Sequence, residues 1–225
     1  MAASGPGSSP LSATAAHYLE AIYYIAHEGE VPRPGRLAEW LGVSHPTVTV
    51  TLQKLARAGW LAVGAEHGIS LSPAGEAAAS AVVRRHRLLE RWLVDVLGFD
   101  WAAADKEAAS LAPGASDEVL EHLDQVLGRP RSCPHGNPVP GRGEVPEGVR
   151  LDLLGEGRPA KVVRISELAE HEAPQVLMLL HRLGLTPGRH LVVRSEGVEI
   201  GLQVDRNLVN IDRGAAKAVW VDLSP

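Results

Sequence analysis

Two pairs of histidine and carboxylate residues have a spacing that suits metal binding. His17 and Glu20 are three residues apart, and His86 and Glu90 are four residues apart, so each pair shares one face of a helix. Imidazole nitrogens and carboxylate oxygens both bind divalent transition metals. Two such pairs on separate helices could therefore hold one cation. A lone pair of this kind is more often a surface hydrogen bond, and that interpretation remains open.

A third group with possible chemistry is the short segment Cys133-Pro-His135. The two side chains could be metal ligands, or a nucleophile and its base. The intervening proline and the flexible surroundings disfavour a rigid catalytic geometry. The chain also lacks a glycine-rich phosphate-binding loop and a Gly-x-Ser-x-Gly elbow, so we expect no enzyme. As the single cysteine, Cys133 excludes an internal disulfide and favours a cytoplasmic location.

The elements that position these residues belong to a chain of ordinary globular composition. It has 225 residues, of which 45% are hydrophobic and 22% charged, with a net charge of −5. It lacks the run of about 20 apolar residues that a membrane span needs, and its amino terminus lacks the features of a signal peptide. We therefore expect no membrane partner.

The amino-terminal part has the pattern of a winged helix-turn-helix. Helices are expected from Ser12 to Gly29, from Pro34 to Gly42 and from the capping residue Ser44 to Gly59. Two short helices joined by a turn that contains glycine form a helix-turn-helix. The runs Trp60–Val63 and Gly68–Leu71 would form the wing. Any three-helix core with a hairpin would show a similar apolar pattern.

The solvent face of the third helix favours binding to double-stranded DNA. Short hydroxyl side chains near a helix amino terminus contact phosphates and base edges, and methyl groups pack on thymine methyls. Since the first two turns carry no arginine, shape and methyl readout should outweigh guanine readout. The candidate DNA-binding residues are Arg33, Arg36, Ser44, His45, Pro46, Thr47, Thr49, Val50, Gln53 and Lys54.

Further along the chain the pattern is helical at first and then strand-like. A long helix is expected from Ser72-Pro73 to Gly98, followed by helices capped by Asp100 and Ser116. Long amphipathic helices after a winged helix commonly form a dimer interface, which predicts a homodimer. The Pro/Gly-dense stretch Gly128–Gly148 indicates a linker or tail. After it, one short helix (EAPQVLMLLHRLG) lies among strands with the sequences KVVRIS, HLVVRS, GVEIGLQV and AVWVDL.

From Thr14 to Gly141 the chain resembles the diphtheria-toxin-repressor family of metal-dependent transcriptional repressors, which includes iron-dependent and manganese-transport regulators. The segment Arg158–Leu223 resembles the third domain of that family, a small SH3-like barrel. The segments that carry the main resemblance are His17–Tyr23, Leu37–Leu61, Leu71–Ala79, Arg84–Gly98, Ser116–Leu123 and Cys133–Gly141.

This resemblance implies a mainly α fold with small β parts. The expected division is a disordered amino terminus (1–11), a winged helix-turn-helix DNA-binding domain (12–72), a helical metal-binding and dimerisation domain (73–141), a Pro/Gly-rich linker (142–157) and an SH3-like, FeoA-like domain (158–225).

The family's metal sites are only partly represented in this sequence. The resemblance implies an ancillary site made of His86, Glu90, Asp105, Glu172 and Gln175, with aspartate in place of a histidine. It implies that His17 and Glu20 contribute to the primary site. The remaining primary ligands would fall at Ala109, Ala112 and Pro113, so three donors are missing there. The resemblance also implies that Cys133–Gly141 is only a structural tail.

The implied function is repression of metal-homeostasis genes by a homodimer that binds operator DNA, with RNA not expected as a partner. The expected co-repressor is a divalent metal, Fe²⁺ or Mn²⁺ first, with Co²⁺ or Zn²⁺ also acceptable to these donors. One alternative is a repressor that binds DNA without metal or responds to another effector. Another is an interaction module whose barrel binds a proline-rich segment such as Arg142–Pro146.

Overall fold

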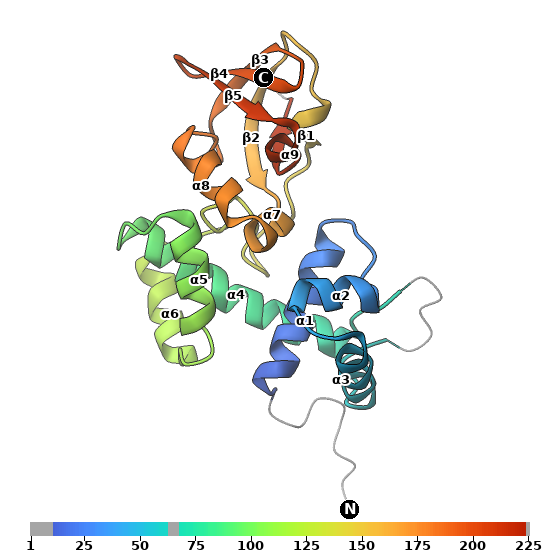
Figure 1. Cartoon of the computed structure of the whole chain (residues 1–225). Coiled ribbons are helices and arrows are strands. Elements are labelled where there is room, and N and C mark those ends of the chain that lie inside the picture. Colours follow the sequence, from blue (N-terminus) through green and yellow to red (C-terminus); the bar gives the residue numbers. More distant parts are fainter. Residues whose placement is uncertain (1–10, 63–67, 224–225) are drawn as a thin grey trace, which may run out of the picture. The chain divides into compact units, whose positions relative to one another are not determined.

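A computed structural model describes residues 11–62 and 68–223. The chain divides into two compact units, the first ending at Arg85 and the second beginning at His86 (Figure 1). Helices dominate both units except at the carboxyl end, which contains one small sheet, so the predicted fold class is confirmed. Among the described residues, no helix combines the length and the apolar character that crossing a membrane requires.

The first unit contains the three predicted helices in order. They are α1 (Ala13–His27), α2 (Pro34–Leu41) and α3 (His45–Arg57). The Ser12 and Ser44 side chains accept backbone N–H bonds at the starts of α1 and α3, as expected for N-caps. Their apolar faces meet in a core that includes Leu19, Ile22, Ile25, Leu37, Val48 and Leu55.

The predicted wing is visible only at its base. Leu61 and Leu71 form an isolated antiparallel bridge, and the Ala62 amide donates to the Ser70 carbonyl at 2.9 Å. The remaining predicted wing residues, 63–67, lie outside the described residues.

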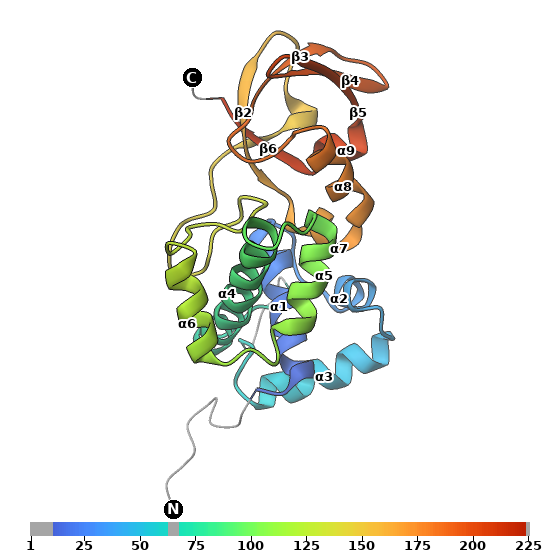
Figure 2. The same cartoon turned by 90° about the vertical axis from the view of Figure 1, so that its left-hand side faces the viewer.

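The helix α4 (Pro73–Asp95) begins in the first unit and ends in the second. In the second unit it is followed by α5 (Trp101–Leu111) and α6 (Asp117–Val126), the helices for which Asp100 and Ser116 provide the N-caps. Figure 2 shows α5 and α6 beside the end of α4. Their shared core contains Leu89, Leu93, Ala104, Ala108, Ala112 and Leu120.

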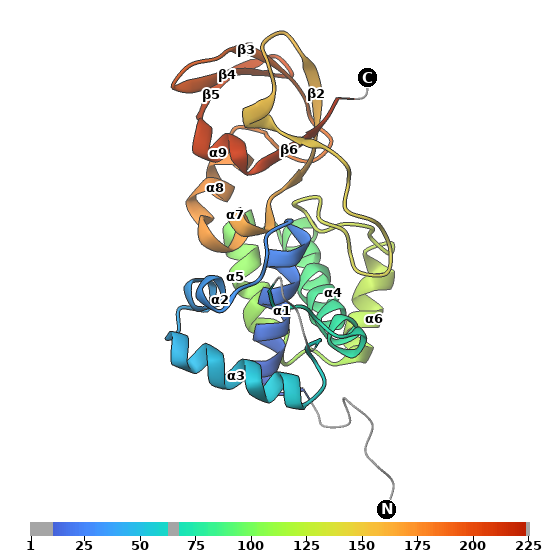
Figure 3. The same ribbon diagram turned by 90° about the vertical axis from the view of Figure 1, so that its right-hand side faces the viewer.

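The sheet is antiparallel, with the strand order β1-β6-β2-β3-β4-β5 (Figure 3). Two of its strands, β1 and β5, and the short helix α9 were not predicted. The elements of this part are β1 (Val149–Arg150), the 3-10 turn η1 (Leu151–Leu153), β2 (Pro159–Ile165), β3 (His190–Ser195), β4 (Glu199–Val204), β5 (Asn207–Asp212), α9 (Arg213–Lys217) and β6 (Val219–Asp222).

Between β2 and β3 the sequence predicts one helix, and the structure contains two. These are α7 (Glu167–Glu172) and α8 (Pro174–Arg182). Ala173 separates them with φ −139° and ψ 62°, because Pro174 disfavours a helical conformation in the residue before it. The break gives α7 its own direction, as Figure 1 shows.

The stretch between α6 and β1 has no helix or strand, as predicted, but it is not a plain linker. Cys133, Pro134, His135, Gly136, Asn137 and Val139 are all buried. The Ile165 amide donates to the His135 carbonyl at 2.8 Å, and the Cys133 amide donates to the Asn137 carbonyl at 2.8 Å. Within the predicted linker or tail, residues 133–139 therefore form a packed part of the second unit, which we call the buried loop.

We expect Gly136→Ala to destabilise the protein strongly. Gly136 has φ +88°, and an added Cβ would lie 2.2 Å from the Val163 carbonyl oxygen of β2. Left-handed strain and overpacking together should cost about 2–5 kcal/mol of unfolding free energy. Urea denaturation followed by circular dichroism would measure this loss.

Gly141→Ala is the matched control, because Gly141 has φ +81° with nothing within 4 Å of an added Cβ. Only the conformational cost of about 1–2 kcal/mol should appear there. Equal losses in the two variants would contradict the close packing of the buried loop on β2.

Candidate metal centre and nucleic-acid interface

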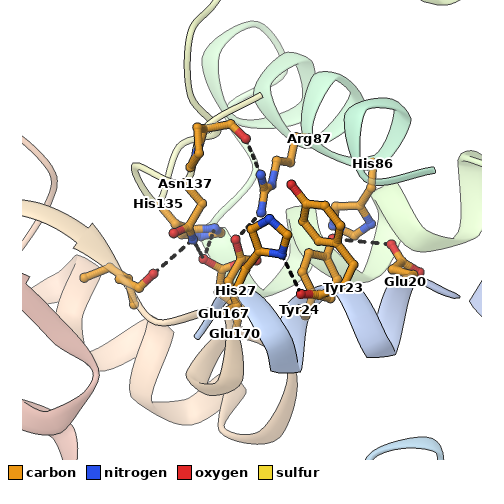
Figure 4. A network of polar contacts seen from close by, with 12 residues as sticks. Glu20, Tyr23, Tyr24, His27, His86, Arg87, His135, Asn137, Glu167 and Glu170 are labelled. Atoms are coloured by element: carbon orange, nitrogen blue, oxygen red, sulfur yellow. Dashed lines mark hydrogen bonds and ion pairs between the residues drawn. The ribbon is translucent and has the colours of Figure 1, made fainter. Parts of the chain in front are cut away.

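A buried cluster of acidic and imidazole groups lies in the second unit, where α4, the buried loop and α7 meet (Figure 4). His135 of the buried loop is its central member. The His135 Nδ1 atom lies 3.1 Å from Glu90 Oε1 on α4 and 3.3 Å from Glu170 Oε1 on α7. Side chains from three separate elements thus converge on one point.

Two groups of possible metal ligands share Glu90. In the first, single donor atoms of Glu90, Cys133 and His135 all lie within 4.8 Å of one another. In the second, the same holds for His86, Glu90 and Asp105, and His86 Nε2 lies 3.3 Å from Asp105 Oδ1. These five residues, with Glu170, offer thiol, imidazole and carboxylate ligands, which is a donor set that divalent transition metals accept.

The cluster is buried, and several of its polar atoms have no hydrogen-bond partner. Glu90 is 1% exposed and His135 is fully buried. Within residues 11–62 and 68–223, neither Glu90 oxygen and neither His135 ring nitrogen has a hydrogen bond of good geometry, despite the short distances between them. Buried polar atoms are normally satisfied, so four such atoms without a hydrogen bond on two adjacent side chains fit a metal-binding site.

The charges of the cluster are strongly coupled. Burial opposes the charged form of His135, but the carboxylates of Glu170 and Glu90 outweigh it and raise its pKa well above the ordinary value. Burial also works against the charged form of Glu90, yet the His135 charge holds the Glu90 pKa below its usual range. Burial keeps the pKa of Glu170 raised despite the same neighbour. An imidazolium thus lies where carboxylates attract positive charge.

Cys133 is a buried free thiol whose pKa is raised to about 12. Burial is the largest cause, and the negative charges of Glu90 and Glu170 add to it. Only a strong competing cation can remove its proton at neutral pH, and a bound transition metal is such a cation.

Neighbouring side chains hold the cluster in place. The Asn137 amide donates to Glu170 Oε1 at 2.6 Å and to the Ile165 carbonyl at 3.0 Å. The rings of Trp101 and His135 pack edge to face, with their centroids 4.6 Å apart. These contacts fix the carboxylate and the imidazole before any ligand binds.

The predicted ancillary set is only partly brought together. His86, Glu90 and Asp105 form one group, but Glu172 and Gln175 are exposed, and Glu172 belongs to neither group of possible ligands among the described residues. From α7 it is Glu170 that reaches the cluster. The break before Pro174 sets the orientation of α7, and it is this orientation that presents Glu170.

The other predicted metal residues lie in the first unit. His17 is exposed on α1, and Glu20 accepts a hydrogen bond from the Tyr24 hydroxyl at 3.3 Å. Their part in a metal site stays a prediction. Of the three positions without donors, Ala112 packs in the core with Ala108 and Leu120, whereas Ala109 and Pro113 are exposed.

The sequence offers Cys133 and His135 as possible ligands but does not place them in this cluster, and it does not predict Glu170. Two signals were present, namely the two potential ligands of Cys-Pro-His and the acidic pair Glu167 and Glu170 one helical turn apart. In the sequence alone, the proline between the two donors disfavours a rigid catalytic geometry. In the structure, burial of the loop supplies that rigidity.

The candidate nucleic-acid interface is the amino-terminal half of α3. Of the ten predicted residues, nine are exposed and Arg36 is half-buried. The Thr49 hydroxyl donates to the His45 carbonyl at 3.1 Å, and the Thr51 hydroxyl donates to the Thr47 carbonyl at 2.9 Å. Val50 is 51% exposed. Since α3 contains no acidic residue and ends in Lys54 and Arg57, its surface suits a polyanion.

Arg36 has contacts within the first unit. Its guanidinium pairs with Glu30 at 2.8 Å and lies 5.5 Å from the centroid of the Trp40 ring. These contacts orient its side chain on α2, and its role as a phosphate ligand stays a prediction.

Three family descriptions match the chain in succession. "Iron dependent repressor, N-terminal DNA binding domain" matches residues 10–69, and "Iron dependent repressor, metal binding and dimerisation domain" matches residues 72–141. "FeoA domain" matches residues 149–223. The first two cover more than half of the chain.

Relatives and solved structures agree with these matches. The iron-dependent repressor IdeR of Mycobacterium tuberculosis is 36% identical over 220 residues, covering 91% of this chain and 95% of the relative. The diphtheria toxin repressor of Corynebacterium glutamicum is 36% identical over 198 residues, covering 84% and 81%. A structure described as a manganese-dependent transcriptional repressor in complex with manganese has a TM-score of 0.81 at 33% identity, covering 92% and 98%. The chain therefore belongs to the iron-dependent repressor family of DNA-binding, metal-dependent transcriptional repressors.

Proposed function

We propose that this protein represses metal-homeostasis genes as a homodimer on operator DNA, with a divalent metal bound at the buried cluster as co-repressor. The observation that carries the proposal is the convergence of Glu90, Cys133, His135 and Glu170 from three elements, with orphaned polar atoms facing one another. The role is cytoplasmic and requires neither a membrane nor RNA.

The bound metal would supply a fixed positive charge among buried ligands. Glu90, Cys133, His135 and Glu170 would hold it, and His86 with Asp105 would form a second, more accessible group around the same Glu90. Fe²⁺ and Mn²⁺ are the expected metals. The thiol of Cys133 also makes Co²⁺ and Zn²⁺ strong competitors, because thiolate ligands favour softer ions than an all-oxygen site does.

Metal binding can influence DNA binding through α4. This helix begins in the first unit and carries His86 and Glu90 in the second, so ligands that fix its carboxyl half act on an element common to both units. Allosteric coupling of this kind is typically about 1–3 kcal/mol.

The dimer would use the exposed apolar surface of the helical part of the second unit. Large apolar side chains exposed on α5, on α6 and in the turn before α5 would otherwise face water. They are Val96, Leu97, Phe99, Leu111, Val119 and Val126.

A second candidate function is repression without metal. It is favoured by Ala109, Ala112 and Pro113, which stand where the family supplies further ligands. The measurement of DNA affinity described below separates the two candidates.

We expect metal binding to release about two protons near pH 7, one from the Cys133 thiol and one from the His135 imidazolium. Both have raised pKa values, so a metal must displace their protons and its apparent affinity should rise with pH. Calorimetric titration with Zn²⁺ in buffers of different ionisation enthalpy measures the number of protons released. Cys133→Ser should release about one proton fewer, and an unchanged count would contradict ligation by the thiolate.

We expect Mn²⁺ or Fe²⁺ to raise the affinity for the protein's own upstream DNA by roughly 5–150-fold over chelator. Cys133→Ser should shift this response to higher metal concentration in a gel-shift assay. His122→Ala is the control, since His122 is exposed on α6. Equal affinity with chelator and with metal would support the metal-independent repressor instead.

We expect Val50 to contact a thymine methyl group in the operator. In duplexes selected by the protein from a random pool, replacing that thymine by uracil removes one methyl and should weaken binding by about fourfold. Val50→Ala should be insensitive to the same replacement, whereas Lys54→Ala should retain the sensitivity. Wild-type binding that ignores every thymine-to-uracil change would rule out methyl readout.

A further inference from the structure

The buried guanidinium of Arg87 contacts all three elements that supply the cluster. Arg87 is itself on α4, one turn before Glu90. Its Nη1 donates to the Pro138 carbonyl of the buried loop, and its Nη2 donates to Glu167 on α7 (Figure 4). No metal ligand proposed above makes this set of connections.

The burial of this contact separates it from an ordinary surface ion pair. The side chains of Arg87 and Glu167 are 3% and 6% exposed. A guanidinium offers several N–H donors in a fixed planar fork, so it can hold two acceptors from different elements at a set separation. Lysine has no such fork.

The two acceptors are close in the chain to metal ligands. Pro138 lies three residues after His135, and the intervening Asn137 donates its amide to Glu170 Oε1 at 2.6 Å. Glu167 lies one turn before Glu170 on α7. Fixing Pro138 and Glu167 relative to α4 therefore fixes the backbone from which His135 and Glu170 project.

We propose that Arg87 is a positioning residue for the metal centre, which sets the separation of α4, the buried loop and α7 so that their ligands converge. The inference rests on the proposed metal function and extends it to a residue that does not touch the metal. Ligand geometry commonly depends on such outer contacts, and their loss typically lowers metal affinity by about 10–100-fold.

The test uses the full-length double variant Arg87→Met/Glu167→Gln. It removes both charges together, so no unpaired charge from this ion pair remains buried. Glu167→Gln by itself is a milder second variant that keeps the Arg87–Pro138 contact. Arg91→Met is the matched control, because Arg91 pairs with Asp95 at 2.8 Å on the exposed side of the same helix.

Two readouts are needed. The first is Co²⁺ binding followed by visible and near-ultraviolet absorption, where a thiolate-to-cobalt band reports ligation by Cys133. The second is hydrogen exchange of the metal-free protein over residues 131–141 and α7. We expect the double variant to bind Co²⁺ about 10–100-fold more weakly, with a weakened thiolate band and faster exchange in these two segments. Glu167→Gln should show a smaller loss, and Arg91→Met none.

Unchanged exchange in the double variant would overturn the positioning role, whatever the metal does. Faster exchange with wild-type Co²⁺ affinity and band would overturn it as well. If the double variant does not fold, wild-type Co²⁺ affinity and exchange in Glu167→Gln would overturn it. If wild-type protein with Co²⁺ shows no thiolate band, the proposed metal centre itself is refuted, and this inference with it, even when hydrogen exchange in the double variant is faster.

Discussion

The buried carboxylate of Glu90 is the constraint on which the second unit depends. An ionised carboxylate in the interior is costly unless a positive charge lies beside it. Here that charge is supplied by His135 of the buried loop, whose ring also lies close to Glu170 of α7. This pairing adds to the hydrogen bonds that hold a Pro/Gly-rich stretch without regular structure in the interior.

The shared position of Glu90 also gives the site its chemical breadth. One of its two ligand groups contains a thiol and is deeply buried, whereas the other contains only imidazole and carboxylate and includes the partly exposed Asp105. The group with the thiol favours a softer ion, whereas the group of imidazole and carboxylates also accepts a harder one. Discrimination between metals therefore depends on how much each ion gains from sulfur.

The sequence was informative wherever the structure depends on local signals. Serine and aspartate caps, glycine turns and apolar periodicity located α1 to α6 and α8 to within a few residues, and alternation located four of the six strands. The strand β5 was missed because Asn207 and Asn210 interrupt its pattern, and α9 because it spans only five residues.

The candidate site depended on tertiary contacts, and there the sequence was less informative. The pair His86 and Glu90 could be predicted because both lie on one helix face. His135 and Glu170 could not, since their approach depends on burial of an irregular loop and on the break between α7 and α8 at Ala173. The spacing of residues along a helix does not reveal the burial of that loop or the direction of α7.

The depth of the cluster has a consequence for timing. Cys133, His135 and Glu90 are each at most 1% exposed, so an ion cannot reach or leave them by diffusion through solvent alone. Exchange requires a transient local opening, and the rate of that opening limits how quickly occupancy follows a change in the surrounding concentration. Such a centre responds to sustained abundance or scarcity and averages over brief fluctuations.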